Sequence, residues 1–145
     1  MHRPTNPAKF SESAALSQRC SLLFPKGLFG FESSKELTWV CNASEHPFGW
    51  LESNGEKGPS FLVVKPQDVG QAYHPQISRE DAALLELRGQ EAPVILAVVT
   101  QHDTGRVTLN LKSPIVLNLD RGKGKQIIPR NVSSFTSQYP LEAAA

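Results

Sequence analysis

The chain has 145 residues, of which 39% are hydrophobic and 20% are charged, and its formal net charge is +1 at pH 7. This composition is typical of a single globular domain that is large enough to bury a core. A charge so close to zero argues against a strong field for nucleic acid or an anionic membrane. No apolar run approaches the roughly 20 residues that span a bilayer, and residues 1–19 lack the apolar segment of a signal peptide. We therefore expect a cytoplasmic protein in which Cys20 and Cys41 stay reduced.

Short apolar segments separated by turns predict a mostly β fold. Residues 1–19 are polar, contain prolines and serines, and show no sustained period, which predicts a disordered N-terminal arm. From residue 20 onward, runs rich in β-branched and aromatic residues alternate with turns rich in glycine, asparagine and proline. We expect one domain over residues 20–141, folded as a small antiparallel β-barrel. The expected strands are 20–24, 37–41, 48–51, 60–64, 94–100, 107–112, 115–117 and 125–128.

One segment departs from the strand pattern and predicts a short helix near residues 78–88. Ser78 followed by Asp81 resembles a capping box, with Asp in place of the usual Glu. Apolar residues then recur at near-helical spacing over residues 82–87, and Gly89 is a natural stop at the C-terminal end.

The loop after the first expected strand carries two large apolar side chains. Phe29 and Phe31 flank Gly30 in a turn whose glycines can take positive φ. The two rings either plug one end of the barrel or form an exposed patch for a partner, and we favour burial.

The barrel is expected to form around residues 107–119. Apolar and polar residues alternate over residues 107–112, and the three residues after Pro114 are all apolar. Pro114 is expected to separate two strands at a bend or bulge, because it has no N–H to give to a ladder. Asn110 and Asn118 either hydrogen-bond nearby backbone and fix turns, which we favour, or present an exposed amide that reads the backbone of another chain.

No arrangement of residues predicts catalysis, a metal site or a cofactor. The four histidines lie far apart on the expected loops or arm, and none has a ligand partner at i+2 or i+4. No nucleophile elbow, phosphate-binding loop or dinucleotide-binding fingerprint is present. An enzyme with an unrecognised site around His74 or His102 remains an alternative, which a pocket joining either imidazole to a buried carboxylate would support.

A basic turn gives a second alternative, an RNA-binding β-barrel. Arg121, Lys123 and Lys125 lie in a glycine-rich turn and could contact phosphate. The near-neutral net charge and the lack of neighbouring aromatic residues favour a solvated turn instead.

A series of motifs, in order from residue 22 to residue 141, resembles the bacterial flagellar assembly factor FliW family. The most specific is the block TLNLKSPIVLN at residues 108–118. The resemblance implies a small, mostly antiparallel β-barrel that is not an enzyme and takes no cofactor. The other matching elements are FPKGLFGF at 24–31, Leu51 with its preceding aromatic residue, FLVVKP at 61–66, Tyr73, VVT at 98–100, GKQ at 124–126 and YP at 139–140.

The resemblance also implies two protein partners. Members of the family bind CsrA, an RNA-binding translational regulator, and they also bind flagellin. The free protein antagonises CsrA and so releases flagellin mRNA from repression, while newly made flagellin competes for it until the flagellin is secreted. By the same resemblance we expect a monomer in the free state, with no direct contact to nucleic acid or membrane.

This chain departs from the family pattern in several respects, one of which is Glu52, where the family commonly has Gln. Family members tend to be acidic, and the loop that corresponds to residues 65–70 is often rich in Asp, whereas here it holds one Asp and one Lys. A weaker negative field should slow association with a basic regulator more than it weakens the bound contacts. The arm before Cys20 has no counterpart in the family pattern.

We expect the partners to dock on an exposed patch formed by residues 64–73 and the neighbouring strand edges. Open β-edges accept partner segments through backbone hydrogen bonds. The loop that carries the two phenylalanines is the second candidate. The candidate partner-binding residues are Phe29, Phe31, Lys65, Asp68, Tyr73, Asn110 and Asn118.

Overall fold

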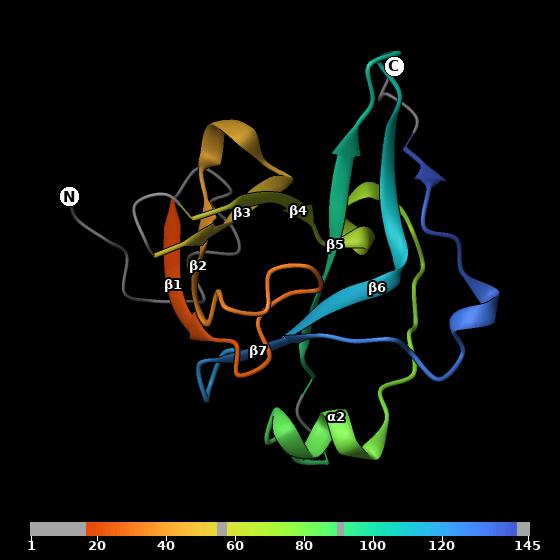
Figure 1. Ribbon diagram of the computed structural model, residues 1–145. Coiled ribbons are helices and arrows are strands. Elements are labelled where there is room, and N and C mark those ends of the chain that lie inside the picture. Colours follow the sequence, from red (N-terminus) through yellow and green to blue (C-terminus); the bar gives the residue numbers. More distant parts are fainter. Residues whose placement is uncertain (1–16, 55–57, 90–91, 142–145) are drawn as a thin grey trace.

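The computed structural model describes residues 17–54, 58–89 and 92–141, and its strands form a closed barrel (Figure 1). Seven strands follow one another in the order β5-β4-β3-β2-β1-β7-β6, and the pairing of β6 with β5 closes the ring. Neighbouring strands are antiparallel except β1 and β7, which pair in parallel through Leu23 and Lys123. The mostly β, antiparallel barrel predicted from the sequence is confirmed.

The elements agree with most of the expected strands. The strands are β1 (Gln18–Leu23), β2 (Glu36–Cys41), β3 (Phe48–Ser53), β4 (Ser60–Val64), β5 (Val94–Gln101), β6 (Val107–Asn118), β7 (Lys123–Gln126) and the two-residue β8 (Tyr139–Pro140), which adds to β6 outside the ring. The helical elements are α2 (Arg79–Leu84) and the 3₁₀ turns η1 (Ala43–Glu45), η2 (Pro66–Val69) and η3 (Val132–Ser134).

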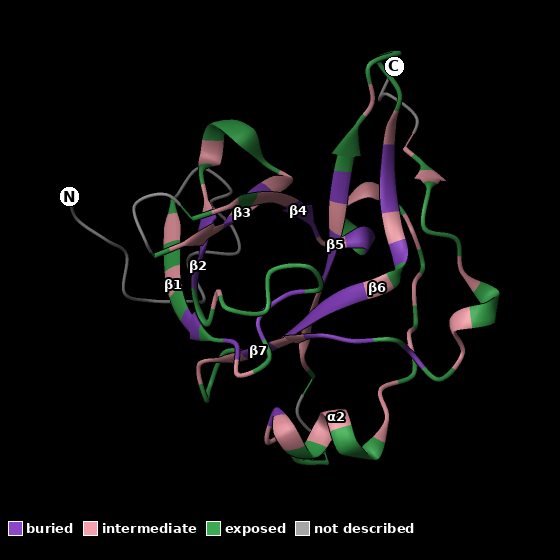
Figure 2. Ribbon diagram, viewed as in Figure 1, coloured by how far each residue is buried: buried purple, intermediate pink, exposed green. Residues whose placement is uncertain are grey.

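The interior of the barrel is filled by the apolar face of each strand. Successive side chains of a strand point to opposite faces, so Leu37 and Trp39 of β2 share one face with Leu51 of β3. Figure 2 shows long buried stretches on β5 and β6, whereas the tip of the hairpin that joins these two strands is exposed. The buried residues of the cluster that fills the barrel interior are Leu22, Phe24, Leu28, Leu37, Trp39, Leu51, Val63, Leu96, Ile115 and Leu117.

Two smaller clusters attach loops to the outside of the barrel. One packs Tyr73 and Phe135 against buried residues of β4, β5 and β6, including Leu109. The other packs Leu85, which directly follows α2, against Val116 of β6 and Ile127, which directly follows β7. These clusters fix the loop between β4 and α2 on one flank of the barrel.

The expected arm, residues 1–19, lies outside the described residues apart from its last three positions. Gln18 and Arg19 belong to β1, where they pair with Cys41 and Val40 of β2. The strand therefore begins two positions before the expected domain start at residue 20.

The expectation of two strands separated at Pro114 is wrong, because β6 runs without a break from Val107 to Asn118. Its register with β5 shifts between Leu96 and Val98, so that residues 111–114 bulge against Ala97. The bulge allows the strand to bend, and Pro114 lies within it as expected. The first half of β6 pairs with β8 and the second half with β7.

The predicted helix is present, and its start is confirmed. Ser78 is the N-cap, and its hydroxyl accepts a hydrogen bond from the backbone N–H of Asp81 at 3.1 Å. The helix is shorter than expected because Glu86, and not Gly89, takes the left-handed conformation, with φ of 58°.

The hydrogen bonds after α2 form a Schellman motif. The N–H of Glu86 donates to the carbonyl of Ala83 at 3.0 Å, and the N–H of Leu87 donates to the carbonyl of Ala82 at 2.9 Å. A glutamate at this position is unusual, because left-handed backbone is costly for a residue with a Cβ. The Glu86 side chain accepts a hydrogen bond from Lys123 and its carbonyl accepts one from Asn118, which offsets part of this cost.

Candidate partner-binding surface

The loop over residues 65–77 is shaped by local backbone chemistry. Pro66 occupies the first turn of η2, where its missing N–H is not needed, and Gly70 ends the turn with a positive φ of 80°. The N–H of Gln71 donates to the carbonyl of Pro66 at 3.0 Å, which turns the chain back toward the barrel. The loop is therefore ordered by its own proline and glycine.

Tyr73 anchors this loop to the barrel. Its hydroxyl donates to the carbonyl of Leu111 at 2.5 Å, and its ring packs edge-to-face on Phe135 with centroids 4.9 Å apart. Burial raises the pKa of the Tyr73 hydroxyl, so the group stays a neutral donor. Tyr73 is half-buried, and a partner could reach only part of its ring.

Lys65 and Asp68 lie close together beside the end of β2. The ammonium of Lys65 is 5.6 Å from the ring centroid of Trp39, a cation–π distance. Burial raises the pKa of the neighbouring Cys41 thiol, the charge of Lys65 opposes that rise, and the charge of Asp68 adds to it. Lys65 is half-buried and lines the same cavity as Tyr73, whereas Asp68 is exposed and is not among the residues that line it.

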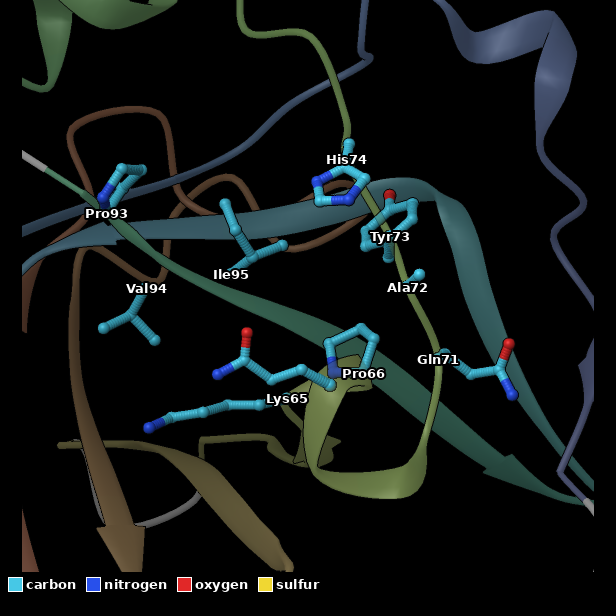
Figure 3. A pocket seen from close by; sticks show the side chains of 10 residues that line it. Lys65, Pro66, Gln71, Ala72, Tyr73, His74, Pro93, Val94 and Ile95 are labelled. Carbon is cyan, nitrogen blue, oxygen red and sulfur yellow. The ribbon is translucent and has the colours of Figure 1, made fainter. Parts of the chain in front are cut away.

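An open cavity of about 280 Å³ separates this loop from the beginning of β5. Figure 3 shows Lys65 and Pro66 across from Val94 and Ile95. Sequence reasoning identified β5 as a central strand and missed its role as a cavity wall, because a free strand edge leaves no local sequence signal. The lining residues are Lys65, Pro66, Gln67, Gln71, Ala72, Tyr73, His74, Pro93, Val94 and Ile95.

The edge of β5 that faces the cavity is not paired with β4. The two strands pair only at Val63 with Val98 and at Val64 with Ala97. Continuing that ladder would place Pro66 opposite Ile95, and a proline has no N–H to donate there. The chain instead turns into η2, which leaves the beginning of β5 paired on one side by β6 alone.

Phe29 and Phe31 form a separate exposed site, and the favoured interpretation that they plug the barrel is wrong. Phe29 is 48% exposed and Phe31 is 43% exposed. The backbone N–H of Phe29 donates to Oε1 of Gln126 on β7 at 2.8 Å, while the Phe31 ring packs edge-to-face on Phe61 at 5.1 Å. This loop thus offers two rings for a partner next to β7, away from the contacts that hold Tyr73.

Asn110 and Asn118 tie down backbone within the chain, as the favoured interpretation predicted. Oδ1 of Asn110 accepts from the N–H groups of Lys112 and Ser113 at 3.0 and 3.2 Å, which shapes the bulge of β6. Asn118 is 4% exposed, and its amide contacts the end of α2. As a correction to the candidate set, the buried Asn118 cannot present its amide to another chain.

The cations of the basic turn are paired with carboxylates. Lys123 lies 2.5 Å from Glu86, Arg121 lies 3.8 Å from the same carboxylate, and Lys125 lies 2.8 Å from Asp81. The hydrogen bond from Lys123 holds the pKa of the Glu86 carboxyl below its usual range. Pairing lowers the positive charge available to phosphate, which argues against the RNA-binding alternative.

Among the described residues, neither His74 nor His102, the histidines of the open enzyme alternative, forms an ion pair with a carboxylate. Among the described residues that line the cavity beside His74, none is Asp or Glu. Nε2 of His102 lies 2.9 Å from the hydroxyl of Thr108. Within residues 17–54, 58–89 and 92–141, no three His, Cys, Asp or Glu side chains gather into a group that could hold a metal ion.

A second concave surface, of about 510 Å³, lies between η1 and the β5–β6 hairpin. Its floor is apolar and includes Phe48, Trp50 and Leu62. Sequence reasoning missed this groove, because side-chain alternation alone does not show which outward faces are left uncovered.

In the part of the chain that the structure describes, no helix is long and apolar enough to cross a membrane.

The family model described as FliW protein matches residues 6–141. The match begins before Cys20, where no counterpart was expected. The flagellar assembly factor FliW of Leptospira biflexa is 40% identical over 124 residues, which cover 84% of this chain and 81% of that protein. The protein of the same description from Natranaerobius thermophilus is 34% identical over 122 residues, covering 83% and 80% of the two chains.

A solved structure shows the same fold. The crystal structure of the flagellar assembly factor FliW superposes with a TM-score of 0.75 at 23% identity, and the match covers 85% of this chain and 86% of that one. The relatives are described as assembly factors, in accord with the expectation of a protein that is not an enzyme. With a family model that spans nearly all of its sequence, the chain belongs to the FliW family of flagellar assembly factors.

Proposed function

We propose that this protein binds the translational regulator CsrA and flagellin in the cytoplasm, and that it relieves repression of flagellin translation by antagonising CsrA. The observation that carries the proposal is the family match over residues 6–141. The surface features agree with a role in binding proteins. An exposed aromatic loop and an open cavity beside a free strand edge are typical of surfaces that accept other polypeptides.

The docking surface that we favour is the loop of residues 65–73 with the beginning of β5. Asp68 supplies an exposed negative charge to this surface, and Tyr73 fixes the loop in place. A preformed loop binds with a smaller entropic cost than a mobile one. The exposed loop with Phe29 and Phe31 is the second candidate.

Antagonism follows from linkage between the two ligands of CsrA. If this protein binds RNA-free CsrA better than RNA-bound CsrA, it must weaken the binding of RNA to CsrA by the same factor. A coupling free energy of about 1–3 kcal/mol corresponds to a roughly 5- to 150-fold loss of RNA affinity. Flagellin that occupies this protein would then return CsrA to its RNA.

Titration calorimetry with purified CsrA and, separately, with flagellin tests the proposal. We expect both to bind the full-length protein. Asp68→Lys should weaken binding of CsrA, because the substitution reverses an exposed charge on the favoured surface. Asp120→Lys is the matched control, because Asp120 is also exposed and lies in the turn between β6 and β7. Failure of both partners to bind would refute the proposed function, while equal effects of the two substitutions would exclude this docking surface.

A further inference from the structure

The cavity beside β5 combines a free strand edge, an apolar wall and a lysine. Residues 94–96 of β5 are paired with β6 on one side. The other edge of these residues faces the loop of residues 65–77. A strand edge of this kind carries backbone N–H and C=O groups that an added segment can pair. Pro66 prevents β4 from covering the edge, since proline cannot continue the ladder opposite Ile95.

The walls of the cavity fit a segment with alternating side chains. Pro66, Val94 and Ile95 supply apolar surface, whereas Gln67, Gln71 and His74 supply polar groups. An extended segment presents successive side chains to opposite faces, so one face could pack on the wall while the other meets solvent. A helix could not use the free backbone groups of β5, because its own N–H and C=O groups are paired internally.

The charge at the cavity points to an acidic group on the segment. Among the described lining residues, Lys65 is cationic and none is Asp or Glu. Its ammonium lies over the ring of Trp39 at 5.6 Å, which positions the charge without neutralising it. Asp68 is exposed outside the cavity lining, so the carboxylate on η2 does not occupy this site.

We propose that the cavity binds an extended protein segment that adds as a strand to the beginning of β5 and carries an Asp or Glu side chain to Lys65. This mode deepens the proposed function and rests on it only for the identity of the protein that supplies the segment. Backbone hydrogen bonds to residues 94–96 supply affinity, and the contact with Lys65 selects acidic segments.

The test uses the full-length protein and a display library of random twelve-residue peptides, so that it does not depend on the binding of CsrA or flagellin. Selected peptides should be rich in Asp or Glu. Lys65→Glu should weaken their binding by at least about tenfold, since a charge-assisted hydrogen bond is replaced by repulsion. Lys26→Glu should have no effect, because Lys26 is exposed in the loop after β1.

Amide hydrogen exchange separates strand addition from simple charge attraction. Binding of a selected peptide should slow exchange at residues 94–96, in alternate positions along the edge. Lys65→Met, which keeps the length of the side chain and removes its charge, serves if Lys65→Glu does not fold. Selection of no peptides, selection of peptides without carboxylates, equal binding by the Lys65 and Lys26 variants, or unchanged exchange at residues 94–96 would each overturn the inference. If the peptides behave as expected while calorimetry finds no binding of CsrA or flagellin, the proposed function fails and the inference stands.

Discussion

The side-chain amide of Asn118, the last residue of β6, donates a hydrogen bond to the carbonyl of Leu85 at 2.8 Å. The same amide lies 3.3 Å from the carbonyl of Glu86, and its oxygen accepts from the N–H of Arg121 at 3.3 Å. One buried asparagine therefore joins the end of α2, the end of β6 and the basic turn. It satisfies the carbonyls of Leu85 and Glu86, which directly follow the last residue of α2.

Replacing Asn118 with alanine should lower the free energy of unfolding by about 1–3 kcal/mol, because it leaves buried polar groups without a partner. Asn110→Ala should cost less, since Asn110 is half-exposed and water can replace its amide. Urea unfolding of both variants measures the difference. An equal loss of stability in the two variants would contradict the conclusion that the buried hydrogen bonds of Asn118 stabilise the end of α2 and the basic turn.

Gly124 of β7 should not tolerate a larger residue. A Cβ at this position would lie 2.3 Å from Cζ of the fully buried Phe24 ring. Gly124→Ala should therefore destabilise the barrel by about 1–3 kcal/mol through overpacking. Gly89→Ala is the control, since a Cβ there meets no atom within 4 Å and should leave the thermal midpoint nearly unchanged.

Tyr73→Phe should lower stability by roughly 0.5–1.5 kcal/mol, because the variant keeps the ring packing on Phe135 and loses the hydrogen bond to the carbonyl of Leu111. Tyr73→Ala should lower it further, because the ring contact is lost as well. Amide exchange of the loop and chemical unfolding measure the two effects. If Tyr73→Phe unfolds at the same denaturant concentration as the wild type, the hydroxyl does not anchor the loop.

The ion pairs of Glu86 should make stability depend on pH in the acidic range. The hydrogen bond from Lys123 lowers the pKa of this carboxyl from its usual 4.5, so the stabilisation is present above pH 4.5 and is lost as the pH falls through the lower folded pKa. The stability difference between the wild type and Glu86→Gln should be largest near pH 7 and disappear in acid. Glu36→Gln, at an exposed position on β2, serves as the control. An equal difference at pH 7 and pH 3 would show that the carboxylate charge is not the source.

Local patterns predicted most strands and the beginning of the helix. The composition of residues 37–41 identified β2, alternation of apolar and polar residues identified the first half of β6, and the hydroxyl of Ser78 caps α2 as its spacing from Asp81 suggested. The order of strands around the barrel was not predictable in this way. The parallel pairing of Leu23 with Lys123 joins residues 100 positions apart, and no periodicity reports such a pairing.

The misses at the candidate site have a common physical cause. Phe29 and Phe31 are exposed because their loop is held by Gln126. Asn118 is buried because the end of α2 packs against it. Both contacts join segments far apart in sequence. The left-handed Glu86 was missed for the same reason, because Lys123 and Asn118 contribute the contacts around it.

The most direct measurement follows the release of RNA from CsrA. A fluorescent RNA from the leader of flagellin mRNA is bound to CsrA, this protein is added, and RNA release is read from the loss of anisotropy. The account predicts release by the wild type, weaker release by Asp68→Lys than by Asp120→Lys, and rebinding of the RNA when flagellin is added. An RNA–CsrA complex that is unchanged by saturating amounts of this protein would contradict it.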